Sequence, residues 1–338
     1  MARKKMEPIT SLGSEDKLTV QKSLPLFALW RSELTLSEFK ILDTYLSRID
    51  SHRPERRSVQ FEKGELEKVL GVKKLNVTDL KSRLRHLMGS VVEIPDASLK
   101  RGVRLVTLFE EAAAEQDDDG QWQVSLECTQ KAMRYFFNIE NLGYLRYKLR
   151  CITSLTSRYT YIMFIYLEAN RYRRSWDVPL DELKQILDCD KEELYKEYKF
   201  FNQKILKRIQ TEMDKKTECR YKYEAIKKGR SVVAIRFTVF PLRQVIESPD
   251  EQQDVPDRGQ QDYLSFYNEA LDNSMTPEQM TVIMSLIREI DIPEGDDIDR
   301  ARYRYLMRKW AVVQQHDSVA PIRSKYLYLK KMLESELG

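Results

Sequence analysis

The sequence predicts an α+β protein in which two domains, each built from helices and a β-hairpin, follow each other and a small all-α domain ends the chain. Three features lead to this fold. Residues 190–213 have apolar side chains at helical spacing, residues 220–239 hold two β-rich runs around a basic turn, and residues 263–338 have helical patterning throughout. A helix that leads into a hairpin with a basic tip is the outline of a winged helix. Because the same order of elements is indicated earlier in the chain, we expect two winged-helix domains in tandem.

The chain of 338 residues is long enough for two or three domains, and its hydrophobic content of 42% is enough to form their cores. Residues 248–259 are polar, acidic and interrupted by prolines, which predicts a linker. The expected segments are a flexible arm over residues 1–16, a first winged-helix domain over 17–140, a second over 144–246, an acidic linker over 247–262 and a helical C-terminal domain over 263–338.

The first domain is expected to contain helices followed by a sheet. Ser37 is expected to cap its first long helix, and Gly71 is expected to end the next one. Asp117–Gly120 has the composition of a turn before the last strand. The expected elements are an apolar segment over 20–27, a helix over 36–49, a strand over 58–61, helices over 66–70 and 77–88, and strands over 91–94, 103–109 and 121–126.

In the second domain the order repeats. Asp181 is expected to cap a helix, and Lys227–Arg230 is expected to form the turn of the hairpin. The expected elements are a long helix over 144–172, an extended segment over 176–180, helices over 181–187 and 190–213, and strands over 220–224 and 231–239.

The helix expected over residues 190–213 has two different faces. On a wheel of ~100° per residue centred on Tyr198, one face is apolar and is expected to point to the core. The opposite arc carries long side chains that can donate hydrogen bonds to phosphate oxygens or base edges. The apolar face holds Leu194, Phe201, Ile205, Ile209 and Met213, and the polar arc holds Lys196, Lys199, Gln203, Lys207 and Gln210, with Asn202 at the border.

Positive charge is concentrated around this helix. The whole chain has a net charge of +4, but residues 141–236 hold 22 Lys and Arg against 13 Asp and Glu, a net charge of +9. Residues 237–338 have a net charge of −6. Such a concentration is the electrostatic footprint expected of a protein that binds a polyanion. The alternative is a solvated helix face in a lysine-rich protein.

We expect the helix to lie in a major groove of DNA and the hairpin tip to reach a phosphate or the minor groove. The alternative for the tip is a solvated turn. The first domain is expected to use its helix over 77–88 in the same way, although a packing or dimer-forming role explains its weaker charge as well. The candidate DNA-binding residues are Lys199, Asn202, Gln203, Lys204, Lys207, Arg208, Lys227, Lys228 and Arg230 in the second domain, and Lys73, Lys74, Thr78, Lys81, Ser82 and Arg85 in the first.

Several other classes of protein are not expected. The four cysteines and three histidines are scattered, so we expect free thiols in a reducing compartment, no metal site and no cofactor. No run of ~18 apolar residues and no secretion signal is present, so we expect a cytoplasmic protein with no membrane partner. The sequence has no His-x-His, His-x-x-Arg or G-x-x-x-x-G-K-[ST] motif of nickases, tyrosine recombinases or nucleotide-binding proteins, so we expect no enzyme.

Four short segments carry a resemblance: Phe201–Leu206, Lys227–Arg230, Ile235–Phe237 and Ser157–Tyr159. They resemble the tandem winged-helix replication initiators of plasmids. The family similarly has a phenylalanine, basic residues and an aliphatic pair, followed by a Lys-Lys-Gly-Arg hairpin tip and a strand that ends in phenylalanine. The resemblance covers about residues 17–246.

The sequence also departs from the pattern of that family. Asn202 and Gln203 stand where arginines are common, and Phe164 and Ile165 replace a usual Tyr-Glu pair. Because Asn and Gln pair best with adenine, the first departure weakens the transfer of guanine readout to this chain.

The resemblance implies a protein that binds direct repeats, called iterons, in double-stranded origin DNA. Family members open the origin as monomers, recruit host replication proteins and often repress their own gene as dimers, so the resemblance also implies self-association. The alternative is a transcriptional regulator with the same tandem DNA reader and no replication role. An interaction scaffold that acts through its tail is a third alternative.

The tail has a weaker resemblance of its own. Residues 305–310 and 321–333 resemble the C-terminal helices of some helicase-loader-type domains. This implies the host replicative helicase or its loader as a partner of residues 263–338, although a plain dimerisation or docking domain explains the pattern nearly as well. The acidic tail is not expected to favour DNA.

Overall fold

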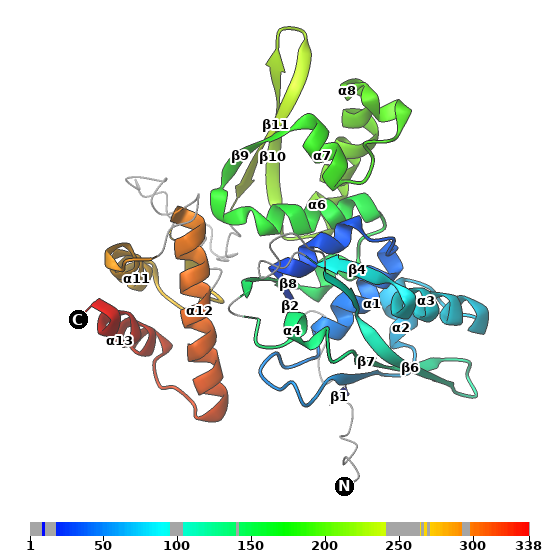
Figure 1. Ribbon diagram of the computed structural model, residues 1–338, viewed down its shortest axis with the longest axis horizontal. Coiled ribbons are helices and arrows are strands. Elements are labelled where there is room, and N and C mark those ends of the chain that lie inside the picture. The colour runs from blue at the N-terminus through cyan, green and yellow to red at the C-terminus, as the bar shows by residue number, and fades with distance from the viewer. Residues whose placement is uncertain are drawn as a thin grey trace, which may run out of the picture. The chain divides into compact units, whose positions relative to one another are not determined.

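The computed structural model describes residues 9–10, 18–94, 104–139, 142–240, 264, 267–268, 271–292 and 298–337 (Figure 1). The chain forms two compact units. One comprises Met1–Glu168, Val178–Glu218 and Ala225–Ile235, and the other comprises Ala169–Asp177, Cys219–Glu224 and Arg236–Gly338. The predicted linker over 247–262 lies outside the described residues, as does the predicted arm over 1–16 apart from Ile9–Thr10.

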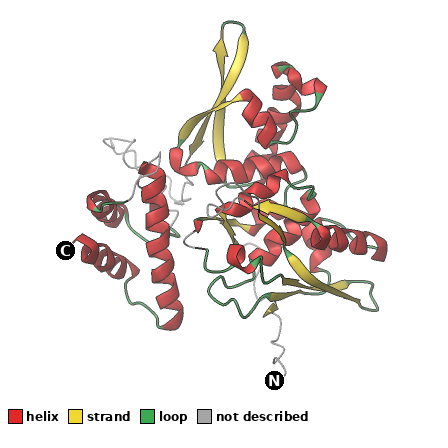
Figure 2. Ribbon diagram, in the orientation of Figure 1, coloured by secondary structure: helices red, strands yellow, loops and turns green. Residues whose placement is uncertain are grey.

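The first domain has the predicted order of helices followed by a sheet (Figure 2). It also contains a 3₁₀ helix, η1, where the sequence indicated only an apolar segment. Its elements are β1 Ile9–Thr10, β2 Thr19–Ser23, η1 Leu24–Arg31, α1 Leu36–Leu46, β3 Ser58–Phe61, α2 Glu65–Leu70, α3 Val77–Gly89, β4 Val91–Ile94, β5 Arg104–Thr107, β6 Phe109–Gln116, β7 Trp122–Cys128 and α4 Met133–Phe136.

The main sheet of this domain has the strand order β1-β3-β7-β6. β1 pairs with β3 in parallel, and β3 and β6 both pair with β7 in antiparallel orientation. Alternate residues of β7 from Trp122 to Cys128 are buried, as expected for a strand with one face on the core. β4 and β5 form a separate two-stranded sheet.

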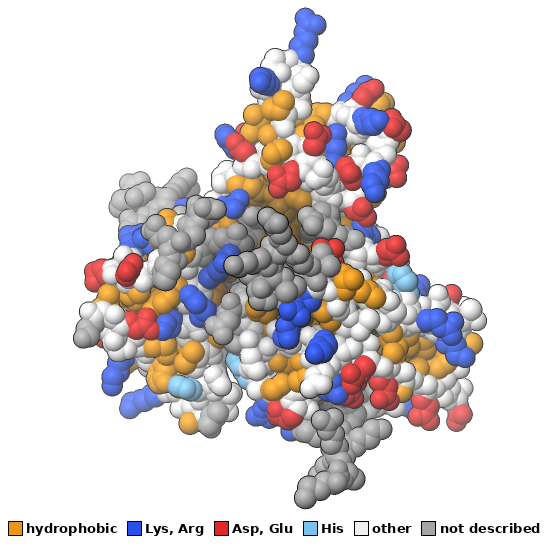
Figure 3. Space-filling view, in the orientation of Figure 1, with side chains coloured by type: hydrophobic (Ala, Val, Ile, Leu, Met, Phe, Trp, Pro, Cys, Tyr) orange, Lys and Arg blue, Asp and Glu red, His pale blue; other side chains and the backbone are white. Residues whose placement is uncertain are grey.

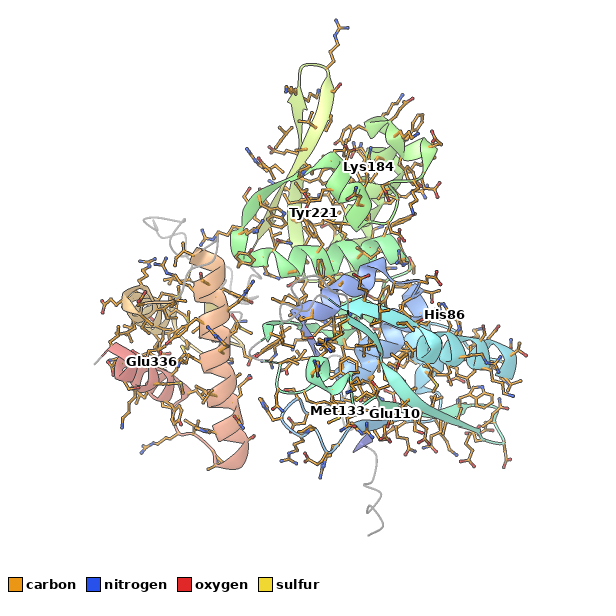
Figure 4. All side chains as sticks on the ribbon, viewed as in Figure 1. His86, Glu110, Met133, Lys184, Tyr221 and Glu336 are labelled. Atoms are coloured by element: carbon orange, nitrogen blue, oxygen red, sulfur yellow. The ribbon has the colours of Figure 1, made fainter. Side chains whose placement is uncertain are left out.

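The N-terminus of α1 differs from the predicted cap. Thr35, not Ser37, precedes the helix, and its backbone N–H donates to Glu38 Oε2 at 2.8 Å in a capping box. Glu38 is buried, and its other oxygen lies 2.8 Å from Nδ1 of His86 on α3 (Figure 4). The carboxylate therefore both caps α1 and ties it to α3, which a serine cap two residues later could not do.

The prediction of one long helix over residues 144–172 is wrong. Residues Tyr144–Lys148 form a strand, β8, that pairs antiparallel with β2 over its whole length. α5 (Leu149–Thr153) and α6 (Arg158–Ala169) follow as two separate helices. A short run of tyrosine and leucine suits either helix or strand, and here pairing with a distant strand decides between them.

A buried polar cluster links β2, α1, β8 and α6. Lys22 Nζ donates to Asp43 Oδ1 at 3.0 Å and to the Tyr161 hydroxyl at 2.6 Å. The hydroxyls of Tyr147 and Tyr161 both donate to Asp43 Oδ2 at 3.0 Å. Burial and the Asp43 carboxylate raise the pKa of both tyrosines well above the ordinary value, so the hydroxyls stay protonated donors. The buried charges are thus paired and hydrogen-bonded, as burial requires.

The second domain follows the predicted order but not every predicted boundary. α7 begins at Leu180 after Pro179, so Asp181 lies in its first turn and is not the cap. β10, β11 and β9 form a three-stranded sheet in the order β10-β11-β9. The elements are η3 Arg171–Arg173, β9 Ser175–Pro179, α7 Leu180–Ile186, η4 Glu193–Lys196, α8 Tyr198–Phe201, η5 Asn202–Leu206, α9 Lys207–Lys216, β10 Arg220–Lys228 and β11 Ser231–Phe240.

The described part of the tail is helical, as predicted. α11 (Pro277–Glu289) begins at a Thr276 capping box, and α12 (Ile298–Val319) and α13 (Lys325–Leu337) follow. Apolar side chains of these helices form a core of their own around Trp310, Ile283 and Leu329. The tail therefore packs as a small helical module. The four cysteines of the chain are buried free thiols, as expected.

Candidate nucleic-acid interface

The candidate recognition helix begins at Tyr198, eight residues later than predicted. Residues 193–196 form a short 3₁₀ helix, η4, and Glu192 and Glu197 on either side of it have extended backbones. Leu194, which fitted the apolar stripe, is 51% exposed. α8, η5 and α9 then form one continuous helical body over residues 198–216.

The inner face of this helix is anchored by fully buried side chains. Phe201, Ile205, Ile209 and Met213 are buried, as predicted, and Leu206 is buried as well. Leu206 lies seven residues before Met213, so it fits the edge of the same apolar stripe. Residues Asn202–Leu206 are π-helical, a turn with hydrogen bonds five residues apart.

The π segment changes the alignment of the outer face. In an α-helix, residues four apart drift by about 40° around the axis. A π turn takes more residues, so η5 reduces this drift from Lys199 through Gln203 to Lys207. All three side chains are exposed, as are Lys204 and Arg208, whereas Asn202 is half-buried. The sequence-predicted residues therefore lie on one helical body, with Lys199, Gln203 and Lys207 along a single row.

Glu212, which the sequence did not single out, holds α9 against the start of α6. Its carboxylate accepts hydrogen bonds from the Thr156 N–H at 2.7 Å, the Thr160 hydroxyl at 2.6 Å and Lys216 Nζ at 2.8 Å. Burial opposes ionisation of Glu212, but these hydrogen bonds outweigh it and lower its pKa. No signal in the sequence pairs Glu212 with threonines more than fifty residues away.

Lys184 is a second anchor that the sequence did not reveal. Lys184 is buried on α7 (Figure 4). Its Nζ donates to the carbonyl of Lys196 at 3.3 Å and lies 5.8 Å from the ring centroid of Phe201. A buried lysine that donates to a backbone carbonyl fixes the turn that leads into the helix. This lysine is thus a structural residue and not a candidate for DNA contact.

The β10–β11 hairpin carries the predicted basic tip, and Figure 1 shows it extending past α7 and α8. Gly229 has φ of 64°, the left-handed conformation that the first position of a tight hairpin turn requires. Lys227, Lys228 and Arg230 are exposed around this turn, and Figure 3 shows Lys and Arg side chains at the apex. The structure therefore places the three cations together at the tip.

At the base of the hairpin, aromatic rings and one ion pair fix the sheet. Phe237 packs between Trp176 and Tyr221, with ring centroids 5.8 and 6.0 Å away. Arg236 donates to both oxygens of Asp177 at 2.7 and 2.9 Å, which lowers the pKa of that carboxyl. Arg236 belongs to the segment that resembles plasmid initiators, and here it is paired within the sheet.

In the first domain, α3 presents its predicted polar face at the surface. Asn76 caps the helix by accepting from the Asp79 N–H at 2.8 Å, and Leu80, Leu84 and Leu87 face the core. Val77 and Val91 join the polar residues along an open groove. The predicted residues Lys73, Lys74, Thr78, Lys81, Ser82 and Arg85 are all exposed, the last four of them on this groove.

Comparison with known families agrees with this architecture. A model described as "Initiator Replication protein, WH1" matches residues 19–168, and one described as "Initiator Rep protein, WH2" matches residues 179–239. The chain belongs to the initiator Rep family. It is therefore a replication initiator of plasmids with two winged-helix domains in tandem, and the alternative of a regulator without a replication role is not favoured. The family is one of DNA-binding proteins.

A solved structure supports the fold of this Rep family member. The "Crystal structure of Pi initiator protein in complex with iteron DNA" matches with a TM-score of 0.54 at 20% identity, and the match covers 66% of this chain and 97% of that chain. No curated protein matches the chain. Helices α11, α12 and α13 lie beyond both matched winged-helix segments.

Two further observations concern the described part of this Rep chain. No helix there has both the length and the apolar character needed to cross a bilayer. Within the same residues, no group of three His, Cys, Asp or Glu side chains is arranged to hold a metal ion.

Proposed function

We propose that this initiator binds origin iterons as duplex DNA, with α8–α9 in a major groove and the β10–β11 tip on the backbone. One observation carries the proposal: Lys199, Gln203 and Lys207 form an exposed row on a helix whose opposite face is buried. A buried face fixes the helix, so the row is presented rigidly. The basic tip adds charge, and the solved relative that shares this fold has iteron DNA bound.

The roles divide between base reading and backbone contact. Gln203 is proposed to read one base pair, with adenine preferred because its amide can donate to N7 and accept from N6. Lys199, Lys204, Lys207 and Arg208 are proposed to contact phosphates beside it, as are Lys227, Lys228 and Arg230 at the tip. Asn202 is proposed to flank the contact. No catalytic step is part of this function, which we place in the cytoplasm without a cofactor or metal.

Selection of binding sites from random duplex DNA at several salt concentrations tests this proposal. Gln203→Ala should relax the preference at one base pair, by about 1–3 kcal/mol of discrimination. Lys227→Ala and Lys228→Ala should instead weaken binding to all DNA sequences alike. They should also reduce the slope of log affinity against log salt concentration by about 1 per lost phosphate contact. Lys131→Ala, which removes an exposed lysine before α4, is the control. If the helix and tip variants bind like the control, the interface is wrong.

We propose that α3 of the first domain contacts the neighbouring groove through Lys73, Lys74, Thr78, Lys81, Ser82 and Arg85. Two modules one helical turn apart need a site of about 20 base pairs. A DNA footprint tests this directly. Charge-removing changes at Lys81 and Arg85 should shorten the protected region by one module and leave the part covered by α8–α9 intact.

We also propose that the first domain self-associates through the sheet beside α3. Val91 is 55% exposed and Leu105 is 60% exposed on the β4–β5 pair, and grouped exposed apolar side chains are typical of a protein interaction site. Leu105→Glu should therefore shift the protein toward monomer in analytical ultracentrifugation. A monomer fraction unchanged from the parent protein would contradict this surface.

For the tail, we propose docking of the host replicative helicase or its loader. The support is its apolar core around Trp310, which is built from helices beyond the matched winged-helix segments. The test is binding of the purified helicase to the full chain and to a chain that ends at residue 247. Equal binding to both would remove the tail from this role.

A further inference from the structure

Strand β6 forms an open edge of the main sheet of the first domain. It is the last strand in the order β1-β3-β7-β6, and within the described residues β7 is the only strand that pairs with it. An edge strand presents a row of main-chain N–H and C=O groups that have no partner in the sheet. β6 is eight residues long, so it can pair with a second extended segment over several residues.

The register shows which main-chain groups of β6 face outward. Trp122 of β7 donates its N–H to Glu67 Oε1, and its C=O accepts from the N–H of Gly64, so both groups point away from β6. Residues that lie opposite each other in an antiparallel ladder alternate between hydrogen-bonded and non-hydrogen-bonded pairs. Gln116 lies opposite Trp122, so its N–H and C=O, and those of Ala114 two residues earlier, point away from β7.

The side chains along this edge are acidic. Residues 109–121 hold six Asp and Glu and no Lys or Arg. Arg57 pairs with Glu110 at 2.8 Å, but within the described residues the carboxylates of Glu111 and Glu115 have no ion-pair or hydrogen-bond partner. Both carboxylates are exposed on the same face of β6, about 13 Å apart along the strand. This edge therefore repels the phosphates of DNA and attracts cations.

The opposite face of β6 leaves room for apolar side chains. Ala114 lies opposite Val124, and Ala112 lies opposite Leu126. Both residues of β7 are fully buried, yet Ala114 is exposed and Ala112 is half-buried. The core-facing side of the sheet is thus incompletely covered at this edge. An added strand would cover the two alanines with its own apolar side chains.

A second copy of this chain does not fit the edge. Two copies that paired through β6 would bring the acidic side chains of both edges together, and like charges directly opposite each other destabilise a pair of strands. Opposite charges stabilise such a pair. The charge of the edge therefore selects a basic segment as its occupant.

We propose that β6 is a docking site for an extended basic segment of a partner protein, which joins the main sheet as a further strand. In this mode of recognition, main-chain hydrogen bonds give affinity and alternate side chains give specificity. The segment needs two Lys or Arg four residues apart, opposite Glu111 and Glu115. Between them it needs apolar side chains that face Ala112 and Ala114. The surface has no part in the proposed reading of DNA, so either proposal can fail without the other.

The test is fluorescence anisotropy of the full chain with a labelled peptide of the sequence Lys-Val-Thr-Val-Lys-Val-Thr-Val-Lys, at about 0.15 M salt. Its lysines have the required spacing, and its valines lie opposite the alanines whose N–H and C=O groups face outward. The parent protein should bind this peptide. The same peptide with N-methylated valines keeps the charge but loses the main-chain donors, so it should not bind.

Variants of the protein test the two parts of the site separately. Glu111→Lys/Glu115→Lys should weaken binding by about 10-fold, the scale of two lost surface ion pairs. Asp118→Lys/Asp119→Lys makes the same change of charge in the turn beyond the strand, so this matched control should stay within about 2-fold of the parent protein. Ala114→Pro removes an outward N–H and leaves the ladder to β7 intact, so it should abolish binding without lowering Tm.

Several outcomes would overturn the proposal. They are no binding of the lysine peptide by the parent protein, equal binding of the N-methylated peptide, and equal losses in the strand and turn variants. If Ala114→Pro does not fold, the N-methylated peptide still tests the main-chain contact on the parent protein. A lower tendency of Ala114→Pro to self-associate in analytical ultracentrifugation would assign the edge to a second copy of the chain and would also overturn the proposal.

Discussion

Replacing Asp43 tests whether the buried polar cluster holds the first domain to α6. Asp43 is fully buried and accepts from Lys22, Tyr147 and Tyr161. Asp43→Ala leaves Lys22 as a buried cation without its carboxylate, and breaking a buried pair in this way costs about 3–5 kcal/mol. A domain of this size loses about 2–4 °C of Tm per kcal/mol, so we expect a drop of roughly 6–20 °C.

The assay is thermal unfolding followed by circular dichroism, with a matched exposed pair as the control. Asp177 also has a bidentate ion pair, with Arg236, but it lies at the surface. Since exposed ion pairs are screened by water, Asp177→Ala should change Tm little. Asp43→Asn keeps acceptor capacity, so it provides a folded variant with an intermediate Tm if Asp43→Ala does not fold.

A double variant distinguishes the cost of an unpaired buried charge from the cost of each substitution itself. Lys22→Met removes the cation, so Lys22→Met/Asp43→Ala no longer leaves one buried charge unpaired. Its loss of stability should be smaller than the sum of the two single losses. Additive losses, or an Asp43→Ala protein as stable as Asp177→Ala, would refute the reasoning.

Three further predictions concern the recognition helix and the hairpin. Glu212→Gln should lower Tm at about pH 6, where the Glu212 carboxylate is ionised. The difference in Tm from the parent protein should close as the pH falls below 4.5, the ordinary pKa of a glutamate, and through the lowered pKa of folded Glu212. The reason is that a lowered pKa stabilises the folded protein only while the carboxylate is ionised. Phe201→Ala should cost about 3–5 kcal/mol in chemical unfolding, more than Phe200→Ala at the half-buried neighbour. Gly229→Ala should cost about 1–2 kcal/mol through its positive φ, whereas Gly89→Ala at a helical position should not destabilise the protein, as the same unfolding assay would show.

Elements with strong local signals could be predicted from the sequence. The alternation along β7, the Thr276-Pro277 start of α11 and the glycine in the turn of the β10–β11 hairpin are each determined by neighbours in the chain. The exposed face of α8–α9 could also be predicted from periodicity, because burial of the apolar face leaves the opposite, polar face in solvent.

Features that depend on distant partners could not be predicted. β8 is a strand because β2 lies beside it, and neither segment contains that information alone. Leu194 fits the helical period, yet the extended backbone at Glu197 separates it from the helix. The π turn over Asn202–Leu206 is a departure from 3.6 residues per turn, and the spacing of the apolar residues does not reveal it.

α6 connects the stability of the first domain to the position of the recognition helix. Tyr161 holds it to Asp43 on α1, while the preceding residue, Thr160, donates to Glu212 on α9. At its first residue, Arg158 donates to the carbonyls of Ser32 and Leu34 and to Asp188 after α7. This arginine is the basic residue of the Ser157–Tyr159 segment that resembles plasmid initiators. Arg158 therefore has a structural role, because its guanidinium connects two loops to α6. This role accounts for a basic residue at this position without any contact to DNA.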